Sequence, residues 1–140
     1  SWCYDNDPNN CNTYGRLYYW QTALTACPDG WHLPSDAEWT QLTNYLGGED
    51  VAGGKMKSTS SLWEFSNTGA TNSSGFSGLP GGFRFSTDSF SDVGHTGNFL
   101  SSTEDDSDHA WTHSLHQGDN DVDRNANPKT AGFSCRCLKD

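Results

Sequence analysis

Basic side chains are scarce in this sequence. The 140 residues include 8 Lys and Arg against 18 Asp and Glu, which gives a formal net charge of -10. Because such a surface repels phosphate groups, we expect no nucleic-acid partner. No apolar run approaches the roughly 20 residues that a membrane-spanning helix requires, so we expect no membrane span. No signal peptide is visible, and the abrupt start at Ser1 indicates a cropped or processed product.

Hydrophobic residues are also few. They make up 32% of the chain, and 15 glycines add to the expected loop content. Aromatic residues compensate at 13%, because a few large rings bury much apolar area. We therefore expect one domain, residues 1–140, with Trp20, Trp31 and Trp39 among its core residues.

The five cysteines contain no Cys-x-x-Cys motif, which argues against a zinc site. In an acidic, loop-rich chain, structural disulfides are the better interpretation, and they indicate an extracellular or bacterial cell-surface protein. We expect Cys3 to pair with Cys11, and Cys27 with Cys137. Cys135 is left over as a buried thiol, an alternative partner for Cys27, or a cross-link to another chain.

Two helices are predicted. Residues Ser35–Leu46 show an apolar face, and Ser35 with Glu38 forms the capping-box pattern at the start. Gly47 and Gly48 mark the end of this helix. An earlier helix, Trp20–Cys27, rests on helical spacing of apolar residues and stops before a proline.

Short strands are expected in the remaining segments. They are Gly15–Tyr18, Gly75–Phe85, Phe99–Leu100, Ala110–Leu115 and Gly132–Leu138. Polar runs at Ser101–His109 and His116–Thr130 read as loops between the last of these. The pattern indicates an α+β domain with two helices and a small, irregular antiparallel sheet.

Five segments carry a family resemblance. They are Cys3-Tyr-Asp-Asn-Asp-Pro-Asn-Asn-Cys11, Gly15–Tyr18, Cys27-Pro-Asp-Gly-Trp-His-Leu-Pro-Ser-Asp-Ala-Glu-Trp39, Leu79–Arg84 and Gly132–Asp140. The chain resembles the Fibrobacter succinogenes major paralogous domain, a group of secreted or surface bacterial proteins. Its third and fifth segments also look like the formylglycine-generating-enzyme group. The resemblance implies a disulfide-stabilised, C-type-lectin-like fold whose large loop-rich lobe presents a ligand face.

The chain departs from the family pattern in three places. Family members usually carry an upstream strand, so we expect its absence here to leave a sheet edge open or filled by another polypeptide. Tyr19 stands where the family often has a Thr or Asn that caps the first helix. Cys135 stands where the family usually has an apolar residue, so the resemblance implies no redox role for it.

The resemblance also bears on catalysis. Formylglycine-generating enzymes use a pair of reactive cysteines in the strand before the terminal motif, and the corresponding Ala110–His116 has none. Cys137 matches a structural cysteine of that group. Without a thiolate no agent for cysteine oxidation exists, and we expect a non-catalytic protein without a cofactor.

Two clusters could hold a metal ion. His109, His113 and His116 lie close in sequence, but on a strand His113 and His116 point to opposite faces, which argues against shared ligation. Three other residues, Asp119, Asp121 and Asp123, alternate as oxygen ligands do in calcium loops.

This acidic segment lacks the glycine and the final glutamate of an EF-hand, because Arg124 and Thr130 occupy those positions. An irregular calcium site remains possible on sequence grounds alone. A solvated acidic loop is the competing interpretation.

The polar final third is the expected ligand face. Aromatic rings flanked by Asp, Asn and His are common on sugar-binding surfaces. We select as ligand contacts His95, Asn98, Trp111, His113 and His116. The function they indicate is a non-catalytic binding or adhesion module, secreted or on the bacterial surface, with a glycan or a protein as ligand.

Two alternatives stay open. The first is a structural subunit or tip of an extracellular filament or surface array, in which the domain contacts copies of itself. The second concerns His95–Thr130, because relatives with this fold include targets of diversity-generating retroelements. Those systems vary adenine-rich codons, chiefly Asn, and yield this residue set.

Overall fold

The computed structural model describes residues 1–140 and has the predicted α+β class. A short 3-10 turn (Tyr4–Asn6) precedes four α-helices: α1 (Pro8–Tyr14), α2 (Trp20–Ala23), α3 (Asp36–Tyr45) and α4 (Glu49–Met56). The strands are β1 (Leu17–Tyr18), β2 (Trp31–His32), β3 (Gly81–Arg84), β4 (Phe90–Val93), β5 (Thr96–Glu104), β6 (His109–His116), β7 (Val122–Pro128), β8 (Phe133–Ser134) and β9 (Leu138–Lys139). None of the helices has the length and apolarity needed to cross a membrane.

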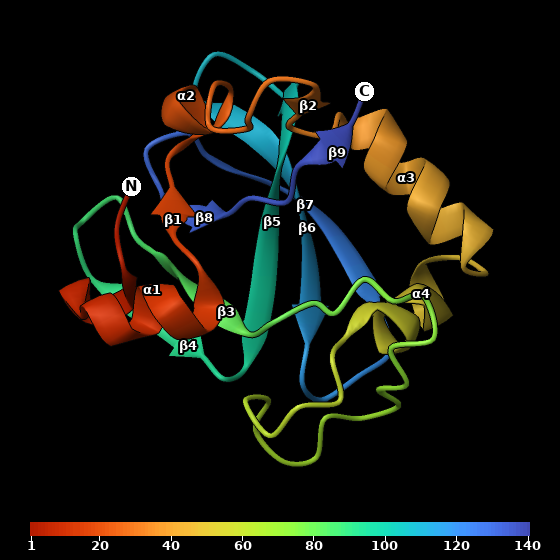
Figure 1. Ribbon diagram of the computed structural model, residues 1–140. Coiled ribbons are helices and arrows are strands. Elements are labelled where there is room, and N and C mark those ends of the chain that lie inside the picture. The colour runs from red at the N-terminus through yellow and green to blue at the C-terminus, as the bar shows by residue number, and fades with distance from the viewer.

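Strand β5 is the centre of a seven-stranded sheet (Figure 1). One edge of β5 pairs with β6, which in turn pairs with β7. Its other edge divides between β3 and β8, both parallel to β5, and these continue into β4 and β1. The expected small antiparallel sheet is therefore wrong in size and in direction, because the main sheet is mixed. Strands β2 and β9 form a separate two-stranded sheet.

Strand β1 is at one end of the sheet, so the open edge expected from the missing upstream strand would lie along its outer side. Trp2 forms an antiparallel bridge with Leu17, and the two residues exchange both backbone hydrogen bonds at 2.8 Å. The first residues of the chain therefore cover part of the outer edge of β1.

Helix α3 has the predicted start and end. The Ser35 hydroxyl accepts a hydrogen bond from the Glu38 amide at 3.2 Å, and the Glu38 carboxylate accepts one from the Ser35 amide at 2.8 Å. This is a complete capping box. Gly47 and Gly48 follow with φ angles of 110° and 104°, a conformation that ends the helix and that side chains disfavour.

The expectation of two helices is wrong, because α1 and α4 were not foreseen. Asp7 caps α1 by accepting a hydrogen bond from the Asn9 amide at 2.9 Å, so the segment that begins at Pro8 is helical. Helix α4 lacks an apolar repeat, and its Gly53 lies against the loop before β7. A β-carbon there would come within 2.1 Å of the Asp121 carbonyl oxygen.

Helix α2 is shorter than predicted and ends at Ala23. Its N-cap residue is Tyr19, whose side chain makes no capping hydrogen bond. Because Tyr19 supplies no capping side chain where the family often has Thr or Asn, the helix is little more than one turn long.

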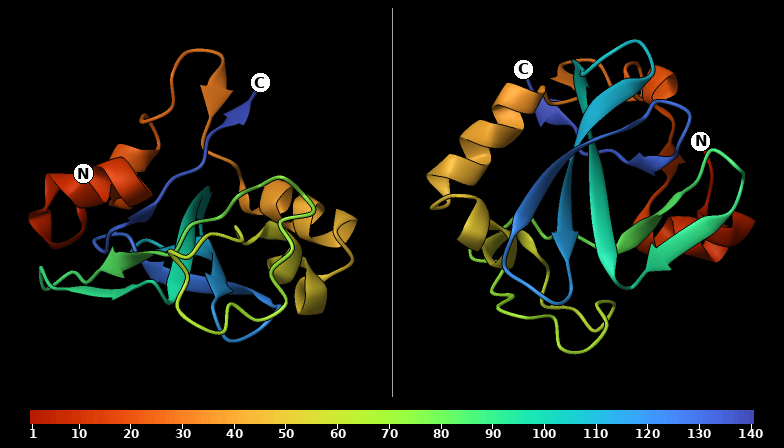
Figure 2. Two further views of the ribbon diagram at one scale, coloured as in Figure 1. Left: turned by 60° about the horizontal axis from the view of Figure 1, so that its bottom comes forward. Right: turned by 180° about the vertical axis from the view of Figure 1, so that it is seen from behind.

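The polar final third forms strands rather than loops, which corrects the expected loop-rich ligand lobe. Strand β7 lies wholly inside the run His116–Thr130. The segment that lacks helices and strands is 57–80, which forms a loop lobe at the bottom of Figure 1 and in both views of Figure 2.

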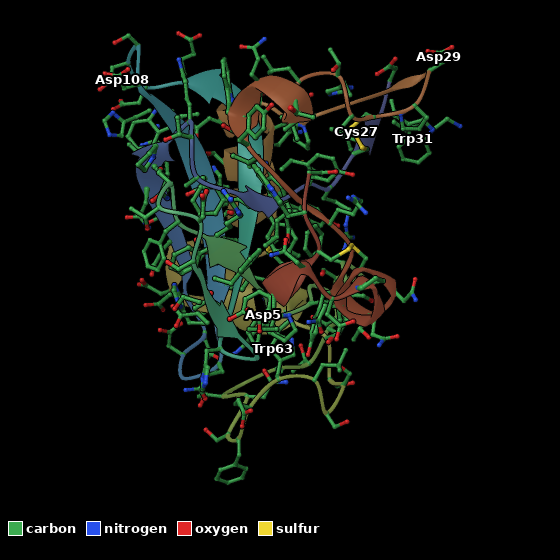
Figure 3. The ribbon with its side chains drawn as sticks, turned by 90° about the vertical axis from the view of Figure 1, so that its left-hand side faces the viewer. Asp5, Cys27, Asp29, Trp31, Trp63 and Asp108 are labelled. Atoms are coloured by element: carbon green, nitrogen blue, oxygen red, sulfur yellow. A yellow bond between two sulfur atoms is a disulfide. The ribbon has the colours of Figure 1, made fainter.

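Two hydrophobic cores lie on the two sides of β5. One gathers Trp39, Leu46, Ala52, Met56, Trp63, Phe99, Leu115 and Val122 under α3 and α4. The other gathers Trp20, Ala23, Leu33, Leu100, Ala110, Ala131 and Phe133. Trp20 and Trp39 are buried as predicted, but Trp31 is 45% exposed. Figure 3 shows Trp31 near Cys27 and Asp29 at one end of the molecule.

Both predicted disulfides are confirmed. Cys3 is bonded to Cys11, and Cys27 is bonded to Cys137 across a sequence separation of 110 residues. Cys135 is a free thiol, and burial raises its pKa to about 12. The thiol is partly buried, and the alternative pairing with Cys27 is wrong, because Cys27 is bonded to Cys137.

Candidate functional site

Side chains alternate between the two faces of β5, β6 and β7. We call the side under α3 and α4 the helix face; it carries Phe99, His113 and Leu115. We call the other side the groove face; it carries Asn98, Ser114 and His116. The predicted ligand contacts therefore do not form one surface. Trp111 lies on the helix face with His113, and His95 lies in the turn before β5.

A groove of about 510 Å³ lies over the groove face. Its floor is a chain of hydrogen bonds between neighbouring strands. The Ser114 hydroxyl donates to the Asn98 side-chain oxygen at 2.7 Å, and the Asn98 amide donates to the Thr96 hydroxyl at 2.8 Å. Asn98 and Ser114 are buried, so these bonds fix the shape of the floor.

One wall of the groove comes from β7. The Asn127 amide donates to the Thr112 hydroxyl at 2.7 Å, which leaves the Asn127 side-chain oxygen free to accept. Asn125 is exposed, and its side-chain amide makes no hydrogen bond within the chain. Both residues were missed because β7 was read as a loop. The alternation Asn125, Ala126, Asn127 was the signal for a strand with one polar face.

The opposite wall is aromatic. Phe83 and Phe85 meet edge to face with ring centroids 4.8 Å apart, and Phe83 stacks on Phe133 at 6.1 Å. Phe85 is 44% exposed, so an apolar ring surface borders the groove. No Lys, Arg, Asp or Glu lines it, and His116 is its one titratable side chain.

His116 also borders a second, polar cleft of about 340 Å³ with His95, Asp119 and Asp123. Its Nε2 atom is buried 2.8 Å from an Asp123 carboxylate oxygen, without the angles of a hydrogen bond. His95 and His116 are thus brought together, at the end of the groove.

The candidate metal ligands do not converge on one point, although His116, Asp119 and Asp123 border the same cleft. His109 contacts Asp106, His113 contacts Asp36 and His116 contacts Asp123. The Asp119 carboxylate accepts a hydrogen bond from the Asp121 amide at 2.9 Å, as in a local turn. No group of three or more His, Cys, Asp or Glu side chains is arranged to hold a metal ion, so the expected calcium site of Asp119, Asp121 and Asp123 finds no support.

The helix face holds a cluster of charged groups instead. The first residue of α3, Asp36, accepts a hydrogen bond from His113 at 2.8 Å and three from the Arg124 guanidinium at 2.8–3.1 Å. His113 is buried and stacks on the Trp39 ring at 5.6 Å. Arg124 also lies 3.4 Å from the centre of the Trp111 ring, so one face of that ring is already covered.

A sequence model of the Fibrobacter succinogenes major domain matches residues 1–139. The chain belongs to this family. No curated protein and no solved structure is significantly similar to it.

Strand β6 of this Fibrobacter succinogenes major domain carries no cysteine. Cys137 is locked in a disulfide, and the Cys135 thiol stays protonated at neutral pH because its pKa is about 12. Neither supplies a thiolate nucleophile.

The cluster of Asp36, His113 and Arg124 on the helix face makes the stability of the folded domain sensitive to acid. Burial raises the pKa of Asp36, but hydrogen bonds from Arg124 and His113 outweigh this effect and hold the pKa below its usual 3.8. Burial holds the pKa of His113 below its usual 6.5, although Asp36 opposes the shift. The folded domain therefore resists protonation of both groups, and the unfolded chain does not.

We expect the free energy of unfolding to fall as the pH drops below 6.5, through His113, and again below 3.8, through Asp36. Urea unfolding at a series of pH values measures this. In a His113→Gln variant the first decline should disappear and the second should remain. His32 has a raised pKa from Asp140 and Glu38 and acts in the opposite sense, but it is unchanged in both proteins. Parallel curves for the two proteins between pH 7.5 and 5 would contradict the role of His113.

Proposed function

We propose that this domain is a non-catalytic ligand-binding module that takes a neutral saccharide in the groove over β5, β6 and β7. The observation that supports the proposal is the lining of the groove, which combines side-chain amides and hydroxyls with phenyl rings and excludes charged residues. A pyranose ring has the complementary surface, with apolar C–H faces and a hydroxyl rim.

Each part of the groove has a role in this proposal. Phe85 offers a partly exposed ring for stacking on a sugar face. The Asn125 amide and the Asn127 side-chain oxygen offer a donor and an acceptor to sugar hydroxyls. Asn98 and Ser114 hold the floor in place through their mutual hydrogen bond, which lowers the ordering entropy of binding.

Other features fit a module outside the cytoplasm. The two disulfides are typical of proteins in an oxidising compartment. We therefore propose a secreted or bacterial cell-surface location and an adhesive role. The C-type-lectin-like relationship remains a proposal from the family resemblance, as does genetic diversification of His95–Thr130, which would alter the groove side chains Asn98, Asn125 and Asn127.

A filament subunit is the second candidate. Two aromatic side chains, Tyr45 at 86% and Phe65 at 97% exposure, could contact a neighbouring molecule. Cys135 does not support this candidate, because its partly buried, protonated thiol is poorly placed for a cross-link to another chain.

The groove can be tested with an array of neutral and charged glycans, followed by calorimetric titration of the best neutral binder. We expect Phe85→Ala and Asn125→Ala each to weaken binding by about five- to tenfold, since each removes one contact worth about 1 kcal/mol. Both side chains are exposed, so the fold should be retained, as circular dichroism would show.

The matched control is Trp111→Ala. This change removes an aromatic ring from the helix face, so groove binding should be unaffected. Loss of binding in Trp111→Ala with retention in Phe85→Ala would place the saccharide on the helix face and reject the groove. Binding of charged glycans alone would reject the neutral ligand class.

A further inference from the structure

The arginines of the domain fall into two groups. Arg84 and Arg124 form ion pairs with Asp88 and Asp36. The remaining arginines, Arg16 and Arg136, have no carboxylate within ion-pairing distance, although acidic residues outnumber basic ones by 18 to 8.

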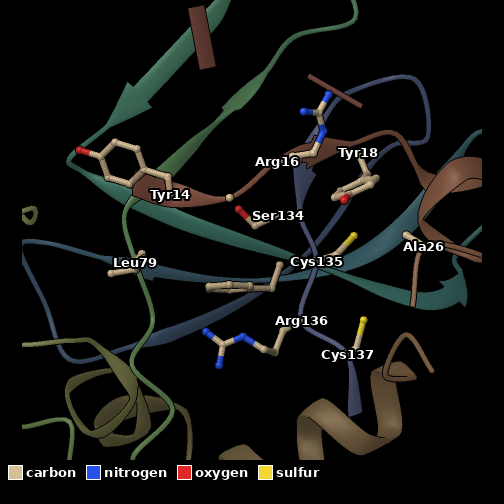
Figure 4. Close-up of a pocket in the computed structure, with 11 residues that line it drawn as sticks. Tyr14, Arg16, Tyr18, Ala26, Leu79, Ser134, Cys135, Arg136 and Cys137 are labelled. Atoms are coloured by element: carbon tan, nitrogen blue, oxygen red, sulfur yellow. The ribbon is translucent and has the colours of Figure 1, made fainter. Parts of the chain in front are cut away.

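Both unpaired arginines line the same pocket, a cavity of about 380 Å³ that is separate from the groove. Figure 4 shows Arg16 and Arg136 at opposite ends of it, with Ser134 and Cys135 between them. No Asp or Glu contributes to the lining. The Cys135 thiol adds no negative charge, because burial keeps it protonated.

The contacts of the two guanidinium groups leave their charge uncompensated. Arg136 donates one hydrogen bond, to the Phe76 carbonyl at 2.7 Å, and lies 4.2 Å from the centre of the Phe76 ring. Arg16 donates to the hydroxyl and the carbonyl of Ser1 and contacts the sulfurs of Cys3 and Cys11. These acceptors are neutral. Arg16 is exposed to solvent, whereas Arg136 is partly buried, so an anion would offset the desolvation of the Arg136 guanidinium.

The rest of the lining is apolar or aromatic, with Tyr14, Tyr18, Leu79 and Phe99 around the two cations. We propose that this pocket binds a small organic anion, a carboxylate carried on an apolar body. The carboxylate meets Arg136, the apolar body contacts the aromatic wall, and Arg16 contributes positive potential from the other end. The site is independent of the saccharide groove.

Benzoate is the probe, and benzamide is its neutral counterpart of nearly the same shape. Heteronuclear NMR titration of the oxidised domain should show millimolar or tighter benzoate binding, with shifts at Tyr18, Ser134 and Arg136. We expect benzamide to bind about tenfold more weakly, and Arg136→Gln to reduce benzoate binding about tenfold without affecting benzamide.

Lys139→Gln is the charge control, because it removes one positive charge from an exposed residue outside the pocket. Its benzoate affinity should stay within about twofold of the wild type. If Arg136→Gln fails to fold, Arg16→Gln and the two ligands on the wild-type domain still decide the question.

Equal affinity for benzoate and benzamide would overturn the proposal, and so would benzoate shifts confined to other surfaces or no binding at all. The outcome is separable from the proposed function. Phe85→Ala should leave benzoate binding unchanged, because Phe85 lines the groove and not this pocket.

Discussion

Replacing Lys57 with methionine is expected to lower the free energy of unfolding by about 3–5 kcal/mol, as urea denaturation would measure. Lys57 is completely buried, at 0% exposure. Its ammonium group donates hydrogen bonds at 2.8 Å to the carbonyl oxygens of Thr68, His116 and Asp119. Methionine fills the space of the stem but leaves these carbonyls without a donor in the interior.

The effect should be large because the three carbonyls belong to different parts of the chain. His116 ends β6, Asp119 lies in the turn before β7, and Thr68 lies in the loop lobe 57–80. The Lys57 ammonium group therefore links the loop lobe 57–80 to the end of β6 and to the turn before β7. Burial lowers the pKa of Lys57, so the charged ammonium group carries a desolvation cost, which these three hydrogen bonds offset.

Helix α4 provides the control. Lys55 donates from its ammonium group to a single carbonyl, that of Leu46, at 2.7 Å and is only partly buried. Lys55→Met should cost about 1 kcal/mol, since one partly solvated acceptor is affected. If the two substitutions destabilise the domain equally, Lys57 does not act as a three-way link.

The features predicted correctly from sequence are those encoded locally. Helix α3 depends on a cap and a glycine stop within its own residues, Ser35, Glu38, Gly47 and Gly48, so its limits could be read directly. The missed elements depend on contacts distant in sequence. Strand β7 consists mainly of polar residues and is held by pairing with β6, and α4 is defined by close backbone contact at Gly53.

Only the part of the candidate site that depends on local sequence could be predicted. Alternation along a strand correctly separated His113 from His116. It could not show that Asn98 would pair with Ser114, or that Phe85 would form the facing wall, because both depend on strand register and order. It also could not show that Arg124 would cover the Trp111 ring.

The second large effect concerns the disulfide between Cys27 and Cys137. Its removal in a Cys27→Ala/Cys137→Ala double variant is expected to lower the free energy of unfolding by about 4–5 kcal/mol. The bridge spans 110 residues, so it strongly restricts the unfolded chain. Both cysteines are replaced because Cys27 and Cys135 pack against the same core, and a lone Cys27 could pair with Cys135.

The disulfide between Cys3 and Cys11 is the matched control, because its sequence separation is only 8 residues. Cys3→Ala/Cys11→Ala should cost about 2–3 kcal/mol, and only the long bridge should raise the urea m-value on removal, since the unfolded state then expands. Equal losses in the two double variants would show that native contacts, not chain restriction, set the stabilisation. The long bridge also fixes the segment between β8 and β9, which carries Arg136. Its loss should therefore weaken benzoate binding while the short bridge, at the Arg16 end of the pocket, has a smaller influence.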